Sequence, residues 1–270
     1  MCELLGLAFN RQINPTFSFA GLLSGSDKNP EGWGIGFYPE HGSTASIFKE
    51  AITGTDSHLA QYLQSYPNLS SQIVLAHIRK SSSGTVNHSN THPFDRFFNG
   101  RQWLFAHNGT LYYPELLKLR YYYPAGDTDS ERSFCWLLAQ LRDMHIKPMF
   151  RGSYVGFSDA DVRSIYQQLL YINVECTGAF NVLLSDGQHL FAYRDIHGNR
   201  PLYYLYRQYP FATTLFRDSD IEVNLNIEKG REEAGYVIAS TPLSSEDWGE
   251  FVPGQLIVFK DGEIVDDFCL

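Results

Sequence analysis

The chain has 270 residues, a mass of 30.8 kDa and a formal net charge of −9. Hydrophobic residues make up 43% of it and charged residues 19%, which is enough apolar material for a sizeable core and excludes a disordered chain. So acidic a chain is not expected to bind nucleic-acid phosphates as its main role. No apolar run approaches the roughly 20 residues that a membrane span needs.

The beginning of the chain and its cysteines predict a reduced cytoplasmic protein. The opening MCELLGLAFNRQ has an acidic third residue and turns polar by position 10, unlike a secretory signal, so we expect it to belong to the mature fold. The cysteines lie far apart and form no CxxC pair, so neither disulfides nor a zinc site are expected. They are Cys2, Cys135, Cys176 and Cys269.

Short apolar runs bounded by Gly, Pro, Asn or Asp predict many strands. In chain order these runs cover residues 4–9, 34–38, 73–78, 103–106, 180–185, 190–193, 202–206, 236–240 and 256–260. The pair Asp261-Gly262 between Phe259 and Ile264 predicts a hairpin at the C-terminal edge.

Helical spacing is clearest at residues 130–142, with Asp129 or Ser130 as the N-cap, and at residues 158–171. A weaker helix is indicated at 56–65, and polar stretches at 24–33, 80–101 and 208–231 separate the elements. The simplest organisation is one domain in which many strands and few helices pack in layers.

Cys2 is the first candidate for chemistry. We expect removal of Met1, because the residue that follows is small, and Cys2 would then carry the α-amine. An α-amine with a pKa near 8 can act as the base for its own thiol. The alternative is a small buried residue at the start of a strand.

Arg79 is the second candidate, because an apolar strand leads into it and a small-residue loop, Lys80 to Gly84, follows. A guanidinium there can hold a carboxylate through two parallel hydrogen bonds. A surface ion pair is the alternative.

A third motif, His107-Asn108-Gly109, ends another predicted strand. The Asn side-chain amide and the Gly N–H can form an oxyanion hole, although a plain Asn-Gly turn has the same sequence. The four histidines at positions 77, 88, 92 and 107 raise the question of a metal, but their spacing fits no helical ligand pair, and we predict neither metal nor cofactor.

The fourth feature is an acidic cluster that opens the predicted helix at Asp127-Thr128-Asp129-Ser130-Glu131. Helix capping explains part of it, and a carboxylate there could also accept hydrogen bonds from a substrate ammonium group. Thr91-His92-Pro93 is a rigid polar turn without evident chemistry of its own.

Taken in order, these motifs resemble the class II glutamine amidotransferases, which are N-terminal nucleophile hydrolases with a four-layer αββα fold. The MCELLG start, Gly32-Trp33-Gly34-Ile35-Gly36-Phe37 and the C-terminal Ile238-Ala239-Ser240-Thr241-Pro242 and Val252-Pro253-Gly254 are similar to the small stand-alone bacterial YafJ-like group. The resemblance implies a single α+β amidotransferase domain over residues 2–270.

The resemblance also implies a role for each matching residue. Cys2 would be the nucleophile, and Asn108 with the Gly109 N–H would form the oxyanion hole. Arg79 would bind the α-carboxylate of glutamine, and Asp129 the α-ammonium, since the family's Asp precedes Ser/Thr-Glu. Ser82, Ser83 and His107 complete the predicted substrate-binding set.

Two departures from the family pattern leave the substrate open. Lys80 stands where many members have an aromatic residue, and Ser82-Ser83 replace Thr-His before Gly84. The hydrolase fold also uses the whole length, so either a separate protein receives the ammonia or the enzyme hydrolyses a γ-glutamyl amide. The alternatives to glutamine hydrolysis are cleavage of a larger γ-glutamyl compound and glutamine binding without turnover. The aromatic stretches 112–123 and 203–211 would line the pocket for the larger compound, or belong to the core, which is the more usual place for aromatic residues.

Overall fold

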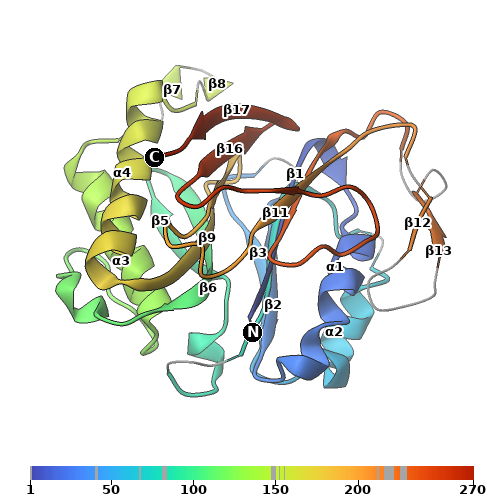
Figure 1. The fold of residues 1–270 in the computed structure, drawn as a ribbon, viewed down its shortest axis with the longest axis horizontal. Coiled ribbons are helices and arrows are strands. Elements are labelled where there is room, and N and C mark those ends of the chain that lie inside the picture. The colour runs from blue at the N-terminus through green and yellow to red at the C-terminus, as the bar shows by residue number, and fades with distance from the viewer. Residues whose placement is uncertain are drawn as a thin grey trace.

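Two antiparallel sheets face each other in the computed structural model, and helices cover their outer faces (Figure 1). The structure describes residues 2–39, 42–66, 68–80, 84–146, 150–151, 153–154, 156–211, 213–215, 222–225 and 230–270.

The first sheet has seven strands in the order β15-β11-β14-β1-β4-β2-β3. Its members are β1 (Glu3–Ile13), β2 (Trp33–Phe37), β3 (Ser46–Glu50), β4 (Ser71–Ile78), β11 (Tyr203–Arg207), β14 (Gly235–Ala239) and β15 (Gly249–Glu250). The helices α1 (Thr16–Leu23) and α2 (His58–Leu63) lie on its outer face (Figure 1).

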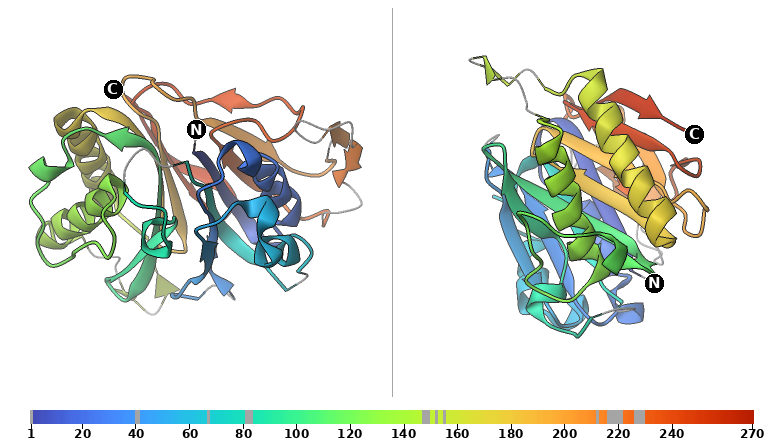
Figure 2. Two further views of the ribbon diagram at one scale, coloured as in Figure 1. Left: turned by 90° about the horizontal axis from the view of Figure 1, so that it is seen from below. Right: turned by 90° about the vertical axis from the view of Figure 1, so that its left-hand side faces the viewer.

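The second sheet has six strands in the order β17-β16-β10-β9-β6-β5. Its members are β5 (Phe94–Phe98), β6 (Arg101–Leu111), β9 (Gly178–Ser185), β10 (His189–Tyr193), β16 (Leu256–Lys260) and β17 (Glu263–Phe268). The helices α3 (Asp129–Asp143) and α4 (Asp159–Cys176) run side by side over it (Figure 2). Two small hairpins are β7 (Phe150–Arg151) with β8 (Ser153–Tyr154), and β12 (Thr213–Leu215) with β13 (Glu222–Asn224). Single 3₁₀ turns are η1 (Ser26–Lys28), η3 (Gly54–Asp56), η4 (His88–Asn90) and η5 (Pro114–Leu116).

The alternation of side chains along β1 explains the layers. Leu4 and Ala8 belong to the apolar cluster between the sheets, with Leu104 of β6 and other residues of both sheets. Leu5 and Leu7 point to the opposite face of the same strand, because successive side chains alternate, and they pack with α1 in the cluster on the outer face of the sheet. A third cluster packs α3 and α4 on the second sheet. The predicted four-layer αββα fold is confirmed.

The N-cap of α3 corrects the sequence prediction. The cap is Thr128, whose hydroxyl accepts a hydrogen bond from Glu131 N at 3.2 Å. Asp129 and Ser130 had been expected there, but Asp129 accepts a bond from Leu111 N and the Ser130 hydroxyl contacts His107. Their polar groups are therefore directed to the neighbouring β6 rather than to the helix terminus.

The predicted strands and the C-terminal hairpin are present, and Asp261 and Gly262 have φ values of 50° and 81°, as a type I′ turn requires. The sequence missed α1, whose buried apolar residues hide its helical period, and β3. It also missed β5 and the β12–β13 hairpin, which lie inside the stretches 80–101 and 208–231 that were expected to be polar and irregular. No helix in the described ranges is long and apolar enough to cross a bilayer.

Candidate active site

Cys2 lies at the open end of the layer between the sheets. In the antiparallel pairing of β1 with β4, Glu3 lies opposite Ile78, which brings Cys2 next to Arg79 and Lys80. The Cys2 Sγ donates a hydrogen bond to the Lys80 carbonyl at 3.0 Å and accepts one from the Lys80 N–H at 3.1 Å. The strand register therefore fixes the thiol against the loop that follows β4.

The electrostatic surroundings of Cys2 have opposing effects. Burial raises the pKa of the Cys2 thiol, and the hydrogen bond to the Lys80 backbone and the charges of Arg200 and Arg79 offset part of this rise. A buried thiol of raised pKa needs a base before it can act as a nucleophile at neutral pH.

A cavity of about 210 Å³ opens beside the thiol. This is smaller than the roughly 300–1,000 Å³ of pockets for drug-sized ligands, so it suits the side chain of an amino acid. Its wall is formed by Cys2, Glu3, Lys28, Asn29, Asn108, Arg200, Pro201, Ser240 and Thr241. Cys2 and Asn108, which are 106 positions apart in the chain, thus share one cavity.

Asn108 reaches this cavity from within β6, which continues to Leu111, so the prediction that the strand ends at this motif is wrong, and so is the alternative of a plain Asn-Gly turn. Leu104 and Ala106 on the same strand belong to the cluster between the sheets, and with period 2 the same face continues to Asn108. The side chain is 3% exposed, and its Oδ1 has no hydrogen-bond partner among the described residues. An amide held beside a thiol in this way can donate to an oxyanion that forms there.

Gly109 is required by a close backbone approach between β6 and β9. A Cβ at this position would lie 1.9 Å from the Ala179 carbonyl oxygen, so no other residue fits. The donor role of the Gly109 N–H stays a prediction.

Arg79 follows β4 and is 3% exposed. Its N–H donates to the Gly32 carbonyl at 2.7 Å, and its guanidinium Nη2 lies 3.4 Å from the Gly84 carbonyl. Arg79 thus follows the strand as predicted, and its guanidinium contacts Gly84 at the end of the 80–84 loop. Ser82 and Ser83 lie outside the described residues, so their predicted part in substrate binding stays a prediction.

Asp129 and His107 meet where α3 begins beside β6. Asp129 Oδ2 accepts a hydrogen bond from Leu111 N at 2.7 Å, and the side chain is buried. His107 contacts Ser130 Oγ through Nδ1 at 2.8 Å and the Ala179 carbonyl through Nε2 at 3.1 Å. Because a carbonyl only accepts, Nε2 carries the proton and Nδ1 accepts from Ser130. Burial lowers the pKa of His107, which agrees with a neutral ring.

Of the predicted residues, Cys2 and Asn108 line the cavity, whereas Arg79, Asp129 and His107 are not among the described residues in its wall. Arg79 is nevertheless adjacent to Lys80, which contacts Cys2, and His107 is adjacent to Asn108. Asp129 in turn is adjacent to Ser130, which contacts His107, while the contacts of all three residues with substrate stay predictions.

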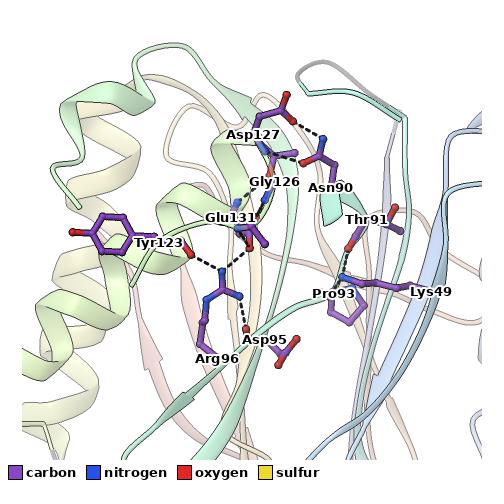
Figure 3. Close-up of polar contacts among 12 residues, drawn as sticks. Lys49, Asn90, Thr91, Pro93, Asp95, Arg96, Tyr123, Gly126, Asp127 and Glu131 are labelled. Carbon is purple, nitrogen blue, oxygen red and sulfur yellow. Dashed lines mark hydrogen bonds and ion pairs between the residues drawn. The ribbon is translucent and has the colours of Figure 1, made fainter. Parts of the chain in front are cut away.

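Glu131, from the same acidic motif, holds the approach to α3 together (Figure 3). It is 1% exposed and accepts hydrogen bonds from Arg96 Nη2 at 2.6 Å, Ala125 N at 2.9 Å and Gly126 N at 2.8 Å. Asn90 is joined to Asp127 through both its amide atoms. These contacts fix the segment before Asp129 against the loop that carries Thr91 to Pro93.

Two buried histidines, His77 and His92, lie close enough to His107 and Arg79 to be influenced by their charges. The centroids of the two rings are 4.2 Å apart. None of the four ring nitrogens has a partner with hydrogen-bond geometry among the described residues. Burial, with the charges of His107 and Arg79, lowers the pKa of His77 to about 3, although the His107 backbone offsets part of the fall. Burial and the neighbouring cationic groups also lower the pKa of His92 well below its usual range.

Arg200 is one of the cavity residues that sequence reasoning did not assign to the site. It lies in a loop whose sequence, Asp195 to Pro201, contains Asp, Gly and Pro turn signals between two strands. Those signals locate a loop, but they do not show that it folds back onto Cys2. No group of three or more His, Cys, Asp or Glu able to hold a metal ion occurs in the part of the chain that the structure describes.

The family model described as "Glutamine amidotransferases class-II" matches residues 1–269. The chain belongs to this family. One relative, the uncharacterized protein MJ1515 of Methanocaldococcus jannaschii, is 42% identical to this chain over 98% of this chain and 71% of its own length. YafJ of Escherichia coli K12, whose assignment as a glutamine amidotransferase is provisional, is 36% identical over 98% of this chain and 100% of its own.

The layered architecture also recurs in solved structures. A predicted glutamine amidotransferase from Pseudomonas aeruginosa matches 98% of this chain and 100% of its own with a TM-score of 0.69 and 27% identity. The shared αββα arrangement is that of the N-terminal nucleophile hydrolases.

Proposed function

We propose that this chain is a glutamine-dependent amidohydrolase in which Cys2 attacks the side-chain amide of glutamine. The observation that carries the proposal is the shared cavity of about 210 Å³, which has a nucleophilic sulfur and an amide donor, Asn108, in its wall. Membership of the class II glutamine amidotransferases supports the same activity.

The chemical steps use groups of this chain. After removal of Met1, the α-amine of Cys2 takes the thiol proton and the sulfur bonds to the amide carbon, giving a tetrahedral oxyanion that Asn108 and the Gly109 N–H stabilise. The C–N bond then breaks, and the ammonium of Cys2 returns the proton to the leaving nitrogen, which departs as ammonia. Water cleaves the remaining γ-glutamyl thioester to glutamate and regenerates the thiol.

The head group of glutamine carries one negative and one positive charge, and Arg79 and Asp129 have the complementary charges. Their burial at the same end of the molecule as Cys2 supports their assignment to the α-carboxylate and the α-ammonium. Ammonia would either leave to solvent or pass to a separate acceptor protein.

Release of ammonia and glutamate from glutamine tests the proposal, with Cys2→Ala as the control. We expect stoichiometric release from the unaltered protein and none above background from Cys2→Ala. Activity that survives in Cys2→Ala contradicts the mechanism. Stabilisation against heat by glutamine without any ammonia release would instead favour a binding module.

A further inference from the structure

The loop between β10 and β11 is held in place by a buried network. Asp195 accepts hydrogen bonds from Asn173 Nδ2 and Asn199 N, both at 2.9 Å, and its own N–H donates to Asn181 Oδ1 at 2.9 Å. Asn173, Asn181 and Asp195 are fully buried. So many satisfied polar groups in the interior give the loop one defined conformation.

The same network ties the loop to the candidate active site. Asn181 of β9 lies opposite Asn108 of β6 in the strand pairing. Its Nδ2 donates to the carbonyls of Arg200 at 3.3 Å and Pro201 at 3.0 Å. The strand that pairs with Asn108 therefore also sets the position of Arg200.

Arg200 lines two cavities. One contains Cys2 and Asn108, and the other, of about 470 Å³, is lined by Tyr112, Gly178, Ala179, His197, Asn199 and Arg200. The Nε atom of Arg200 is buried and has no hydrogen-bond partner among the described residues. The described wall of this second cavity contains the Arg200 guanidinium and no carboxylate, so the cavity favours an anion.

We infer that the second cavity receives the amine portion of a γ-glutamyl amide and that Arg200 binds a carboxylate on that portion. This inference rests on the proposed function, because the amide carbon must lie at Cys2. In a γ-glutamyl dipeptide the second residue's carboxylate is separated from the scissile nitrogen by a single carbon atom. A group so near the amide lies within reach of a guanidinium that lines the cavity of Cys2.

Tyr112 supports an organic leaving group rather than ammonia alone. The residue is 67% exposed and forms part of the second cavity, so its ring offers an apolar face to a substrate side chain. The same bonds form and break as in the hydrolysis of glutamine. The sulfur displaces an amino acid in place of ammonia, and the leaving nitrogen takes the proton from the Cys2 ammonium. Water then releases glutamate from the thioester.

The experiment compares γ-glutamyl-alanine with γ-glutamyl-alaninamide, which differ only in the carboxylate. Because both share the γ-glutamyl group and the scissile amide, a general loss of activity in a variant cancels in the ratio of their kcat/KM values. We expect the unaltered protein to prefer the carboxylate by about tenfold or more, and Arg200→Gln to bring the ratio close to one.

Arg200→Lys keeps the charge but loses the planar fork, so it should retain part of the preference. Arg163→Gln is the matched control, because Arg163 lies on α4 against the Phe268 ring and lines neither cavity, and its ratio should equal that of the unaltered protein.

A ratio near one in the unaltered protein, or a preference that survives in Arg200→Gln, overturns the inference. Cys2-dependent hydrolysis of glutamine measured in the same preparation shows in either case that the proposed function stands. If neither glutamine nor the two γ-glutamyl compounds release glutamate, the proposed function and this inference fail together.

Discussion

The sulfur of Cys2 is held on two sides by the backbone of one residue, Lys80, which donates its N–H to Sγ and accepts from it through the carbonyl. A thiol satisfies both contacts, whereas a thiolate keeps the N–H bond and is repelled by the carbonyl oxygen. Deprotonation therefore removes one of the two contacts that hold the sulfur against the Lys80 backbone.

Loss of the Lys80 N–H should make Cys2 harder to ionise. Lys80→Pro removes the donor, and we expect its rate of alkylation by iodoacetamide at pH 8 to fall several-fold, because a hydrogen bond to the thiolate lowers the thiol pKa. Lys80→Ala keeps the N–H and controls for loss of the side chain. Equal rates in the proline and alanine variants would show that the N–H has no influence on Cys2.

Asn108→Ala should lower kcat for glutamine by about 10²–10³-fold with a much smaller change in KM, since an oxyanion donor acts mainly in the transition state. Steady-state release of glutamate measures both constants. A rise in KM at constant kcat would instead assign Asn108 to substrate binding.

Asp129 combines a structural contact with a predicted binding role, and two substitutions separate them. Asp129→Asn keeps an acceptor for Leu111 N but loses the charge, so we expect KM for glutamine to rise about tenfold or more with little change in Tm. Asp129→Ala also leaves Leu111 N without this acceptor and should cost a further 1–3 kcal/mol or so of unfolding free energy. An unchanged KM in Asp129→Asn would remove Asp129 from the binding site.

Much of this architecture could be predicted from local patterns. The apolar runs gave the central strands, and the spacing around Phe134 and Leu137 gave α3. Cys2 precedes a buried strand, Arg79 follows one and Asn108 lies within one, and the pairing of these strands brings the three residues close together. Period 2 along each strand explains that convergence once the pairing is known.

Long-range packing accounts for what the sequence did not reveal. Arg200 enters the site because Asn181, on a distant strand, holds the carbonyls of its loop, and no local pattern encodes that contact. β5 was missed because Asp95 and Arg96 interrupt its apolar residues, yet Arg96 is paired with the buried Glu131. The N-cap was misplaced because the polar groups of Asp129 and Ser130 are used by β6.

Stability should fall in acid because His77 and His92 stay neutral in the folded protein. Their pKa values are lowered from about 6.5 in the unfolded chain, to about 3 for His77. Between these values the unfolded state binds more protons, so the free energy of unfolding decreases as the pH falls below 6.5, by up to about 1.4 kcal/mol per pH unit for each ring.

Urea unfolding at pH 7, 6, 5 and 4 measures this slope. His77→Leu should reduce the slope of the unfolding free energy against pH by about 1.4 kcal/mol per pH unit, the contribution of one proton. His88→Leu, which replaces an exposed side chain, should leave that slope as in the unaltered protein. A slope that His77→Leu does not alter would mean that the ring titrates alike in both states.

Glu131→Gln should destabilise the fold by about 1–3 kcal/mol, because a buried carboxylate that accepts three hydrogen bonds, one of them from Arg96, loses its charge. For a protein of this size that corresponds to a fall in Tm of roughly 2–4 °C per kcal/mol, which calorimetry measures. The exposed Glu115→Gln is the matched control and should stay within about 0.5 kcal/mol. Equal Tm values for the two variants would contradict a structural role for Glu131.

The most direct test of the central claim is the intact mass of the purified protein before and after reaction with a diazo-ketone analogue of glutamine. The account predicts a chain without Met1 that gains a single adduct, mapped to Cys2, with labelling lost in Arg79→Ala. A protein that keeps Met1 and still hydrolyses glutamine, or an adduct on any other residue, would contradict it.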